Sequence, residues 1–526
     1  MRRGALQAAV LVCWMCLPAW TEPAPKPAHP GGIDPDDPPE RTFVDDWFIV
    51  RLADSDAGWA HITFRREGDR VISGITMRFT FARAGQNIQV DSTEGAVETV
   101  AGDPLSFEWT MKLAVTEMRI TGTVKNGKVH ISSTQFGNTT RQTHDFPAGA
   151  KMSWGVMAEQ LRRGLAPGTE YDVAVYAPTL RSDGAVKAHV AVGQKEEFQA
   201  LGRVSEGVKV ITTLEVTGDY PLGRLETVDW VDASGHVLKS KTLLPGFGKL
   251  EMLRADEATA KAAGSEGAEV FLSTLIPVAK PIDRKAARAI TYKLTIADAG
   301  GQSPPDIPAT AMQTPGPWIR RSMELRVARI DHDELRSVET VRAPEMSAEF
   351  LEPNLWINSD DSDIVAMARQ AAGGEKRPYA ICDRLRRYVT DTISDKNLSV
   401  GFATASEVAR NRQGDCSEHA VLLAALGRAV GIPSRVVYGI VYVPTFQATD
   451  NVFGFHMWVQ FFIGEKWVDF DAAQGESDCN PTHIAFTTSS MKDVSMADFA
   501  FPLLRIIGQL KLEVLDVQMH QFTATE

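Results

Sequence analysis

The chain has 526 residues, enough to bury more than one hydrophobic core, and its 44% hydrophobic and 23% charged residues are typical of a globular protein. Its 55 basic and 67 acidic residues give a net charge of −12, and the sequence contains no long basic run. Because nucleic-acid backbones are bound by clustered Lys and Arg, this charge balance argues against a nucleic-acid partner.

The first residues have the pattern of a secretory signal. Two arginines precede an apolar run over residues 5–20, which is short for a membrane span. We therefore predict a signal peptide over residues 1–21 and an exported protein that is periplasmic, in the cell envelope or secreted. No clear cleavage motif precedes Glu22, so the sequence also allows an uncleaved leader, which would anchor the chain to a membrane.

Outside the leader the chain has three cysteines, Cys382, Cys416 and Cys479. Three are too few for a disulfide scaffold in a chain of this length, and the odd number leaves at least one free thiol. In an oxidising compartment, a thiol that stays free is either buried and inert or used for chemistry. The sequence allows either a disulfide between Cys382 and Cys479 or two buried thiols.

The N-terminal half has the pattern of a β protein. Residues 22–41 are rich in proline, which predicts a semi-extended linker. Short runs of β-branched and aromatic residues then alternate with turn signals such as Asn126-Gly127, which predicts an antiparallel β-rich domain over residues 42–265. One helix is predicted within it, over residues 156–165.

The composition changes near residue 350. Residues 266–349 are predicted to be a β-type linking segment, whereas residues 350–490 contain helical patterns and form a second domain. Its first predicted helix has Ser359 as the N-cap, and the next begins near Pro378. Residues 491–526 are predicted to be a C-terminal extension that packs on the core. The fold class predicted for the whole chain is therefore α+β.

The strongest candidate for chemistry is Cys416. The sequence Gly414-Asp415-Cys416 directly precedes residues 417–430, which are apolar enough to form a buried helix. At a helix N-terminus, the unpaired backbone N–H groups and the helix dipole favour a thiolate over a thiol. Taken alone, however, a single cysteine beside a buried helix is more often a small hydrophobic residue than a nucleophile.

Forty residues further on, two strands are predicted with Gly464-Glu465 as a two-residue turn. In that register His456 and Asp471 project from the same face as diagonal neighbours, within reach of a hydrogen bond. Asp469 shares this face and is an alternative acid. A carboxylate behind the imidazole would orient it as a base for Cys416, although a lone histidine on a strand is more often structural.

These segments together resemble the core of the transglutaminase-like superfamily. The resemblance is carried by G-D-C at 414–416, G-I-P-S-R-V-V at 431–437, H-M-W at 456–458 and W-V-D-F-D at 467–471, and it covers roughly residues 375–480. It implies a papain-like layout in which Cys416 is the nucleophile, His456 the general base and Asp471 its partner.

The chain departs from the family pattern at two places. Gln460 stands where the family often has a carboxylate, and Ala472 and Ala473 follow Asp471 in place of the usual Pro-Thr. Neither change removes a member of the predicted triad. The backbone N–H of Cys416 is the only oxyanion donor that the sequence indicates.

Two further sets of residues have side chains that could take part in chemistry. His419 lies one turn after Cys416 and is an alternative base, although its place on the same helix favours a role in capping or packing. His419, His456, His483 and Asp471 could be combined as metal ligands, but no tight spacing such as H-x-x-x-H occurs among them. We therefore predict no metal and no cofactor.

The reaction implied is acyl transfer from a protein or peptide amide, through a thioester, to water or to an amine acceptor. The β-rich region shows no catalytic pattern and is interpreted as a scaffold or as a substrate-presenting domain. The alternative is a catalytically silent envelope binding or assembly module that retains the fold.

Overall fold

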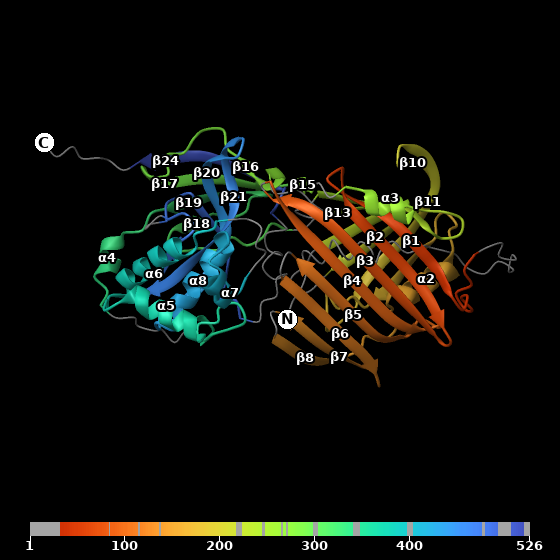
Figure 1. The fold of residues 1–526 in the computed structure, drawn as a ribbon. Helices are drawn as coiled ribbons and strands as arrows, with labels where there is room; N and C mark the ends of the chain where they lie inside the picture. The colour runs from red at the N-terminus through yellow and green to blue at the C-terminus, as the bar shows by residue number, and fades with distance from the viewer. Residues whose placement is uncertain are drawn as a thin grey trace. The chain divides into compact units, whose positions relative to one another are not determined.

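A computed structural model of the chain describes residues 32–519, except for positions 84, 114–115, 136–137, 217–222, 245–247, 265–266, 270–271, 298–302, 340–347, 397–402, 476–478 and 493–505. The predicted signal peptide and residues 22–31 of the predicted linker lie outside the described residues. The chain is α+β, as predicted, and divides into two compact units between Val270 and Phe271 (Figure 1). Within the part of the chain that the structure describes, no helix has the length and apolar character needed to cross a membrane.

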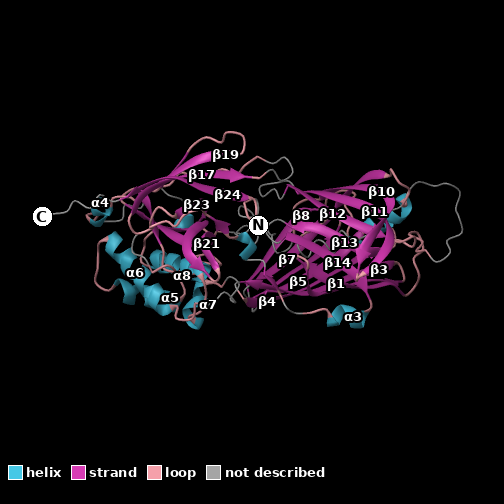
Figure 2. Ribbon diagram, turned by 90° about the horizontal axis from the view of Figure 1, so that it is seen from above, coloured by secondary structure: helices cyan, strands magenta, loops and turns pink. Residues whose placement is uncertain are grey.

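The first unit is built on one large antiparallel sheet (Figure 2). Strands β1 to β8 follow one another as a meander on one side, β9 to β14 do the same on the other, and the two series meet where β1 pairs with β14. The short β15 pairs with β3 in parallel. The strands are β1 (Thr42–Leu52), β2 (Ser55–Glu67), β3 (Arg70–Arg83), β4 (Gln86–Thr99), β5 (Pro104–Leu113), β6 (Thr116–Lys125), β7 (Lys128–Gln135), β8 (Asn138–Asp145), β9 (Glu170–Val175), β10 (Val186–Ala200), β11 (Arg203–Val216), β12 (Gly223–Val231), β13 (Val237–Leu244), β14 (Gly248–Ala255) and β15 (Ala268–Glu269).

Alternation of apolar and polar residues gives this sheet one buried face. In β5, Phe107, Trp109, Met111 and Leu113 are buried, and the residues between them are more exposed. Since successive side chains of a strand point to opposite faces, this period of two directs the apolar residues to a common core.

Helix α2 (Ser153–Arg163) begins and ends earlier than predicted. Its start is set by the buried carboxylate of Glu98 in β4, which accepts hydrogen bonds from the backbone N–H groups of Met152 at 3.2 Å, Trp154 at 2.5 Å and Gly155 at 2.9 Å. Burial raises the pKa of Glu98 to about 7, although these N–H groups act in the opposite direction. The cap comes from a distant strand, so no local sequence signal marks it. A second helix, α3 (Glu257–Ala262), follows β14.

The second unit combines helices with two smaller sheets. One sheet has the strand order β16-β21-β20-β23, with β22 pairing to the other side of β21. Helix α8 packs on β20 and β21, and α5, α6 and α7 pack on α8. These elements are α4 (His332–Arg336), α5 (Ser362–Ala372), α6 (Pro378–Thr392), α7 (Ala405–Asn411), α8 (Cys416–Ala429), β16 (Ile276–Pro277), β20 (Ser434–Phe446), β21 (Thr449–Ile463), β22 (Lys466–Phe470) and β23 (His483–Ser489), with short 3₁₀ turns at Leu272–Thr274 and Ala348–Phe350.

Among the helices that precede α8, one start agrees with the prediction and another differs. Helix α6 begins at Pro378, as predicted. Helix α5 begins at Ser362 with Asp361, and not Ser359, as its N-cap, because the carboxylate of Asp361 accepts a hydrogen bond from the N–H of Asp363 at 2.8 Å.

The remaining sheet, in the order β18-β19-β17-β24, contains three strands from the predicted linking segment and one strand, β24, from the predicted C-terminal extension. Its strands are β17 (Ala287–Ile296), β18 (Gln313–Pro315), β19 (Ser322–Ala328) and β24 (Leu510–Met519). The side chain of Gln313 bonds both backbone groups of Ala485, donating to its carbonyl at 2.8 Å and accepting from its N–H at 2.9 Å. This sheet therefore holds β23 in place.

Candidate active site

Cys416 is the first residue of α8, as predicted, and a capping box fixes its backbone. The side chain of Asp415 accepts a hydrogen bond from the N–H of Ser417 at 2.9 Å, and Glu418 accepts one from the N–H of Asp415 at 2.9 Å. Gly414 precedes this cap with φ of 143°, and a Cβ there would lie 2.3 Å from Cγ of Glu418. A glycine is thus required for the helix to begin at this cysteine.

The carboxyl of Glu418 is fully buried beneath the start of the helix. It also accepts a hydrogen bond from the N–H of Ala403 at 3.1 Å. Burial, together with the nearby charge of Asp415, raises the pKa of Glu418 to about 8. This carboxyl ties the start of α8 to the chain before α7.

The predicted hairpin is present in the predicted register. Ile463 lies opposite Lys466 and Val459 opposite Phe470, across a turn in which Gly464 and Glu465 both have positive φ. That geometry is typical of the two-residue turns that match the twist of β-strands. It places His456 of β21 and Asp471, directly after β22, on one face.

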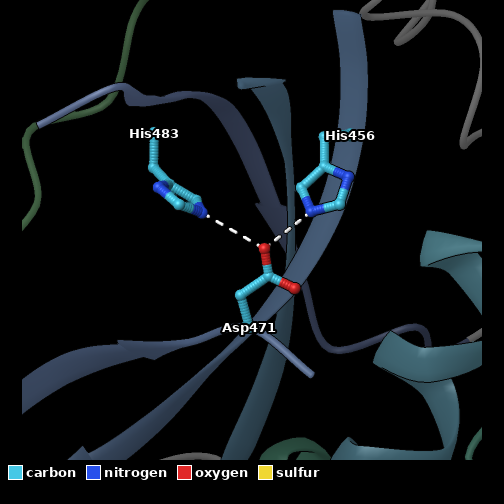
Figure 3. A group of neighbouring side chains, drawn as sticks. All are labelled: His456, Asp471 and His483. Atoms are coloured by element: carbon cyan, nitrogen blue, oxygen red, sulfur yellow. Dashed lines mark hydrogen bonds and ion pairs between the residues drawn. The ribbon is translucent and has the colours of Figure 1, made fainter. Parts of the chain in front are cut away.

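The side chains of His456 and Asp471 are in direct contact. Nε2 of His456 lies 2.8 Å from Oδ2 of Asp471. The second oxygen of Asp471 accepts hydrogen bonds from the N–H groups of Ala473 at 2.8 Å and Gln474 at 3.1 Å. A second imidazole, that of His483 in β23, approaches Oδ2 of Asp471 to 3.2 Å (Figure 3). Two imidazole nitrogens and two backbone N–H groups therefore surround this carboxylate.

The contacts between His456, Asp471 and their neighbours shift the pKa values of His456 and Asp471. Burial alone would raise the pKa of Asp471, but the charges of His456 and His483 and their hydrogen bonds hold it well below its usual range. Burial likewise acts to lower the pKa of His456, yet the charges of Asp471 and Cys416, and hydrogen bonds to both, raise it well above 6.5. The pair is therefore a carboxylate beside an imidazolium.

The imidazole of His456 interacts with Cys416 as well as with Asp471. Because Nε2 is taken by Asp471, Nδ1 is the atom left for the thiol. The structure thus brings together the three residues predicted as nucleophile, base and acid. They come from the start of a helix, the middle of a strand and the end of a hairpin.

Asp469, the predicted alternative acid, has other partners. One of its oxygens accepts hydrogen bonds from Nε1 of Trp458 at 2.6 Å and from Nε2 of Gln460 at 2.9 Å. The amide oxygen of Gln460 in turn accepts a bond from Nε of Arg435 at 2.8 Å. Burial raises the pKa of Asp469. These contacts favour Asp471 as the partner of His456 and leave Asp469 to fix the Trp458 ring, which stacks near His456.

His419 is buried on α8, and its Nδ1 lies 2.6 Å from the carbonyl oxygen of Asp415. Burial lowers its pKa. This contact within one helical turn agrees with the role in capping and packing that the sequence favours for His419.

The sequence indicates His483 only as a member of a possible metal set. The structure places it with His456 and Asp471, and one ligand atom from each lies within 4.8 Å of the others. No close sequence spacing marks this group, because the three residues come from separate β elements that meet only in the folded sheet.

The sequence allows a disulfide between Cys382 and Cys479, and the structure does not form it. Cys382 is a free, buried thiol on α6, so it is not joined to Cys479. Burial raises the pKa of Cys382 well above its usual value. Its reactivity is accordingly expected to be low.

The comparison with protein families identifies the region that contains this site. Residues 365–472 match the transglutaminase-like superfamily. The chain carries a transglutaminase-like domain. The match includes Cys416, His456 and Asp471 and agrees with the family that the sequence motifs indicated.

Solved structures similar to parts of the chain have low identity. A provisionally assigned cysteine protease from Cytophaga hutchinsonii is 17% identical, with a TM-score of 0.30, over 44% of this chain and 91% of that one. A β-barrel-like protein from Brucella abortus, from a domain family of unknown function, is 13% identical, with a TM-score of 0.28, over 41% and 95%. The periplasmic domain of TgpA from Pseudomonas aeruginosa is 14% identical, with a TM-score of 0.24, over 38% and 87%. No curated protein matches the chain.

Proposed function

We propose that the transglutaminase-like domain is a thiol acyltransferase or amidase in which Cys416 is the nucleophile, His456 the general acid and base, and Asp471 its orienting partner. The observation that carries the proposal is the imidazole of His456, which contacts Asp471 through Nε2 at 2.8 Å and interacts with Cys416 as well. A nucleophile, a base and a group that orients the base are the parts that covalent acyl transfer requires.

In the proposed reaction, the Cys416 sulfur attacks the carbonyl carbon of an amide and forms a C–S bond. The C–N bond breaks, and the departing nitrogen takes the proton of the His456 imidazolium, which leaves a thioester and a neutral imidazole. Water or an amine then attacks the thioester and gives a proton to His456, and the sulfur departs. Asp471 holds the ring throughout, and the backbone N–H of Cys416, which has no acceptor within its helix, is the proposed oxyanion donor.

The proposed substrate is a protein or peptide amide, and the products depend on the acceptor. Water gives hydrolysis, as in a cysteine peptidase or amidase, whereas a primary amine gives transamidation.

We further propose that the protein acts outside the cytoplasm, since two arginines and an apolar run open the sequence.

The decisive experiment compares the wild type with Cys416→Ala on a peptide carboxamide, with and without a primary amine. Cys382→Ala is a matched control, because it removes a buried free thiol by the same change. We expect turnover by the wild type and the control and none by Cys416→Ala. Incorporation of the amine identifies a transferase, and ammonia release without incorporation identifies a hydrolase. Turnover by Cys416→Ala at the wild-type rate would refute the proposal.

Thiol labelling provides a test that needs no substrate. An alkylating reagent is expected to modify Cys416 at least about 100-fold faster than Cys382, because Cys416 is partly accessible and paired with His456 and Cys382 is buried. Equal labelling of the two thiols, or slow labelling of both, would favour the catalytically silent binding module instead.

A further inference from the structure

The group formed by His456, Asp471 and His483 contains one more imidazole than a thiol, base and acid triad needs. Figure 3 shows the two rings directed at the same carboxylate oxygen, with Nε2 of His456 at 2.8 Å and Nε2 of His483 at 3.2 Å from Oδ2 of Asp471. Asp471 and His483 are buried, and the side chain of His456 is 8% exposed. Two imidazoles and one carboxylate are a common ligand set for divalent transition-metal ions.

The second nitrogen of His483 restricts what can lie between these rings. Nδ1 of His483 lies 3.3 Å from the carbonyl oxygen of Asn480, which can only accept a hydrogen bond, so Nδ1 carries a hydrogen. In a neutral ring, Nε2 would then present a lone pair to a carboxylate oxygen that already accepts a bond from His456. A cation between the two rings and this oxygen relieves the repulsion.

The spacing suits a small ion. Tetrahedral Zn²⁺ binds nitrogen and oxygen at about 2.0–2.2 Å, which separates neighbouring ligand atoms by about 3.3–3.5 Å. The three ligand atoms lie within 4.8 Å of one another, so the two rings need only small movements to admit the ion. The outer contacts are in place as well, since Nδ1 of His483 faces Asn480 and the other oxygen of Asp471 accepts two backbone N–H groups.

We propose that Nε2 of His456, Oδ2 of Asp471 and Nε2 of His483 bind a divalent transition-metal ion such as Zn²⁺, and that this ion reversibly inhibits the enzyme. The inhibition depends on the function proposed above, whereas the binding does not. Cys416 is not a ligand, because it faces the other nitrogen of His456. A solvent molecule completes the coordination.

The proposed inhibition follows from the proton balance. The ion takes the Nε2 lone pairs of both histidines, and the Nε2 proton of His456 leaves to solvent. His456 is then a neutral ring with its remaining hydrogen on Nδ1, facing Cys416. It has no lone pair with which to accept a proton from the thiol and no longer contacts Asp471 as a donor. The base and acid steps of acyl transfer both stop while the ion is bound.

Binding is tested with Co²⁺ on the full chain after treatment with a chelator, because Co²⁺ bound by a thiolate shows a near-ultraviolet charge-transfer band and Co²⁺ bound by nitrogen and oxygen does not. We expect one ion per chain, visible d–d bands and no thiolate band. Cys416→Ala should bind within about threefold of the wild type, and His483→Gln should bind at least about tenfold more weakly. His130→Gln, a change of an exposed histidine in β7, is the matched control and should not alter binding.

A thiolate band in the wild type would show that Cys416 is a ligand and would overturn the proposed ligand set. This outcome does not depend on the variant, so it remains a test if His483→Gln does not fold. If folded His483→Gln binds Co²⁺ as tightly as the wild type does, the proposed ligand set is also overturned.

The inhibition is tested by activity. Zn²⁺ should inhibit wild-type turnover, and a chelator should restore it. His483→Gln should need at least about tenfold more Zn²⁺ than the wild type for the same fractional loss of its own metal-free rate. Tight Zn²⁺ binding without inhibition would refute the inhibitory role and leave the metal site intact. If the metal-free wild type shows no turnover, that result counts against the proposed function and not against the metal site, because Co²⁺ binding is measured independently of activity.

Discussion

The imidazole of His456 and the carboxylate of Asp471 form a hydrogen bond of 2.8 Å across 15 residues of sequence. The hairpin turn at Gly464 and Glu465 sets the register that makes this contact possible. Because both side chains are almost completely buried, the contact links the protonation of the ring to the charge of the acid. Four predictions concern this pair and the elements that hold it.

Replacing Asp471 by Asn should lower kcat by roughly 10³–10⁴-fold, because an amide N–H facing Nε2 forces the ring into the wrong tautomer. Nδ1 would then carry a hydrogen and could not accept one from Cys416. Asp469→Asn is the matched control. Its oxygen can still accept from Trp458 and Gln460, so we expect less than about a tenfold loss. Steady-state kinetics on a peptide amide measures both, and a larger loss in Asp469→Asn would reverse the assignment of the acid.

The pH dependence of stability should report the charge of His456. Its folded-state pKa is raised above 6.5, so its contribution to stability is fully present below about pH 6.5 and is lost as the pH rises through the folded-state pKa. This contribution is about 1.4 kcal/mol for each pH unit that separates the folded-state pKa from the unfolded-state pKa. The difference in the free energy of unfolding between wild type and His456→Gln should therefore shrink at alkaline pH. Urea denaturation from about pH 5 to about pH 9 measures this, and a difference that stays constant or grows would contradict it.

Gly414→Ala should disturb the start of α8. The new Cβ would lie 2.3 Å from Cγ of Glu418, at a backbone φ of 143° that disfavours alanine. We expect a loss of about 1–3 kcal/mol in the free energy of unfolding and slower alkylation of Cys416. Gly374→Ala is the control, since a Cβ there meets no described atom within 4 Å. Equal stability of the two variants would show that the close contact with Glu418 does not constrain the helix start.

Gly439→Ala tests the packing that brings His483 to the site. Gly439 lies opposite His456 in β21 and opposite Ala485 in β23, and a Cβ there would lie 2.0 Å from the carbonyl oxygen of Ile484. We expect a loss of about 1–3 kcal/mol in the free energy of unfolding as β23 is pushed from β20. Gly454→Ala should change the free energy of unfolding little in comparison, because the nearest atom to a Cβ at that position is Cδ2 of Leu275, at 3.5 Å. Thermal denaturation compares the two, and a similar melting temperature for both would contradict the prediction.

Local sequence signals are sufficient to predict part of this protein. The helix that starts at Cys416 follows from a glycine, a capping aspartate and an apolar run. The hairpin follows from two strands on either side of Gly464-Glu465. Because side chains alternate along a strand, that turn also predicted that His456 and Asp471 share a face. The motifs around these residues were enough to indicate the transglutaminase-like family, which the match over residues 365–472 supports.

The contacts between distant segments become visible in the folded chain and not before. The start of α2 depends on Glu98 from β4, and the choice between Asp471 and Asp469 depends on which side chains reach each carboxylate. His483 joins the site through β23, whose place is fixed by β20 and Gln313. Hydrogen bonds and charge interactions act over a few ångströms in space, whatever the separation in sequence, so these partners carry no local signal. They set the protonation of His456 and create the second imidazole contact on Asp471, from which the proposed metal site is inferred.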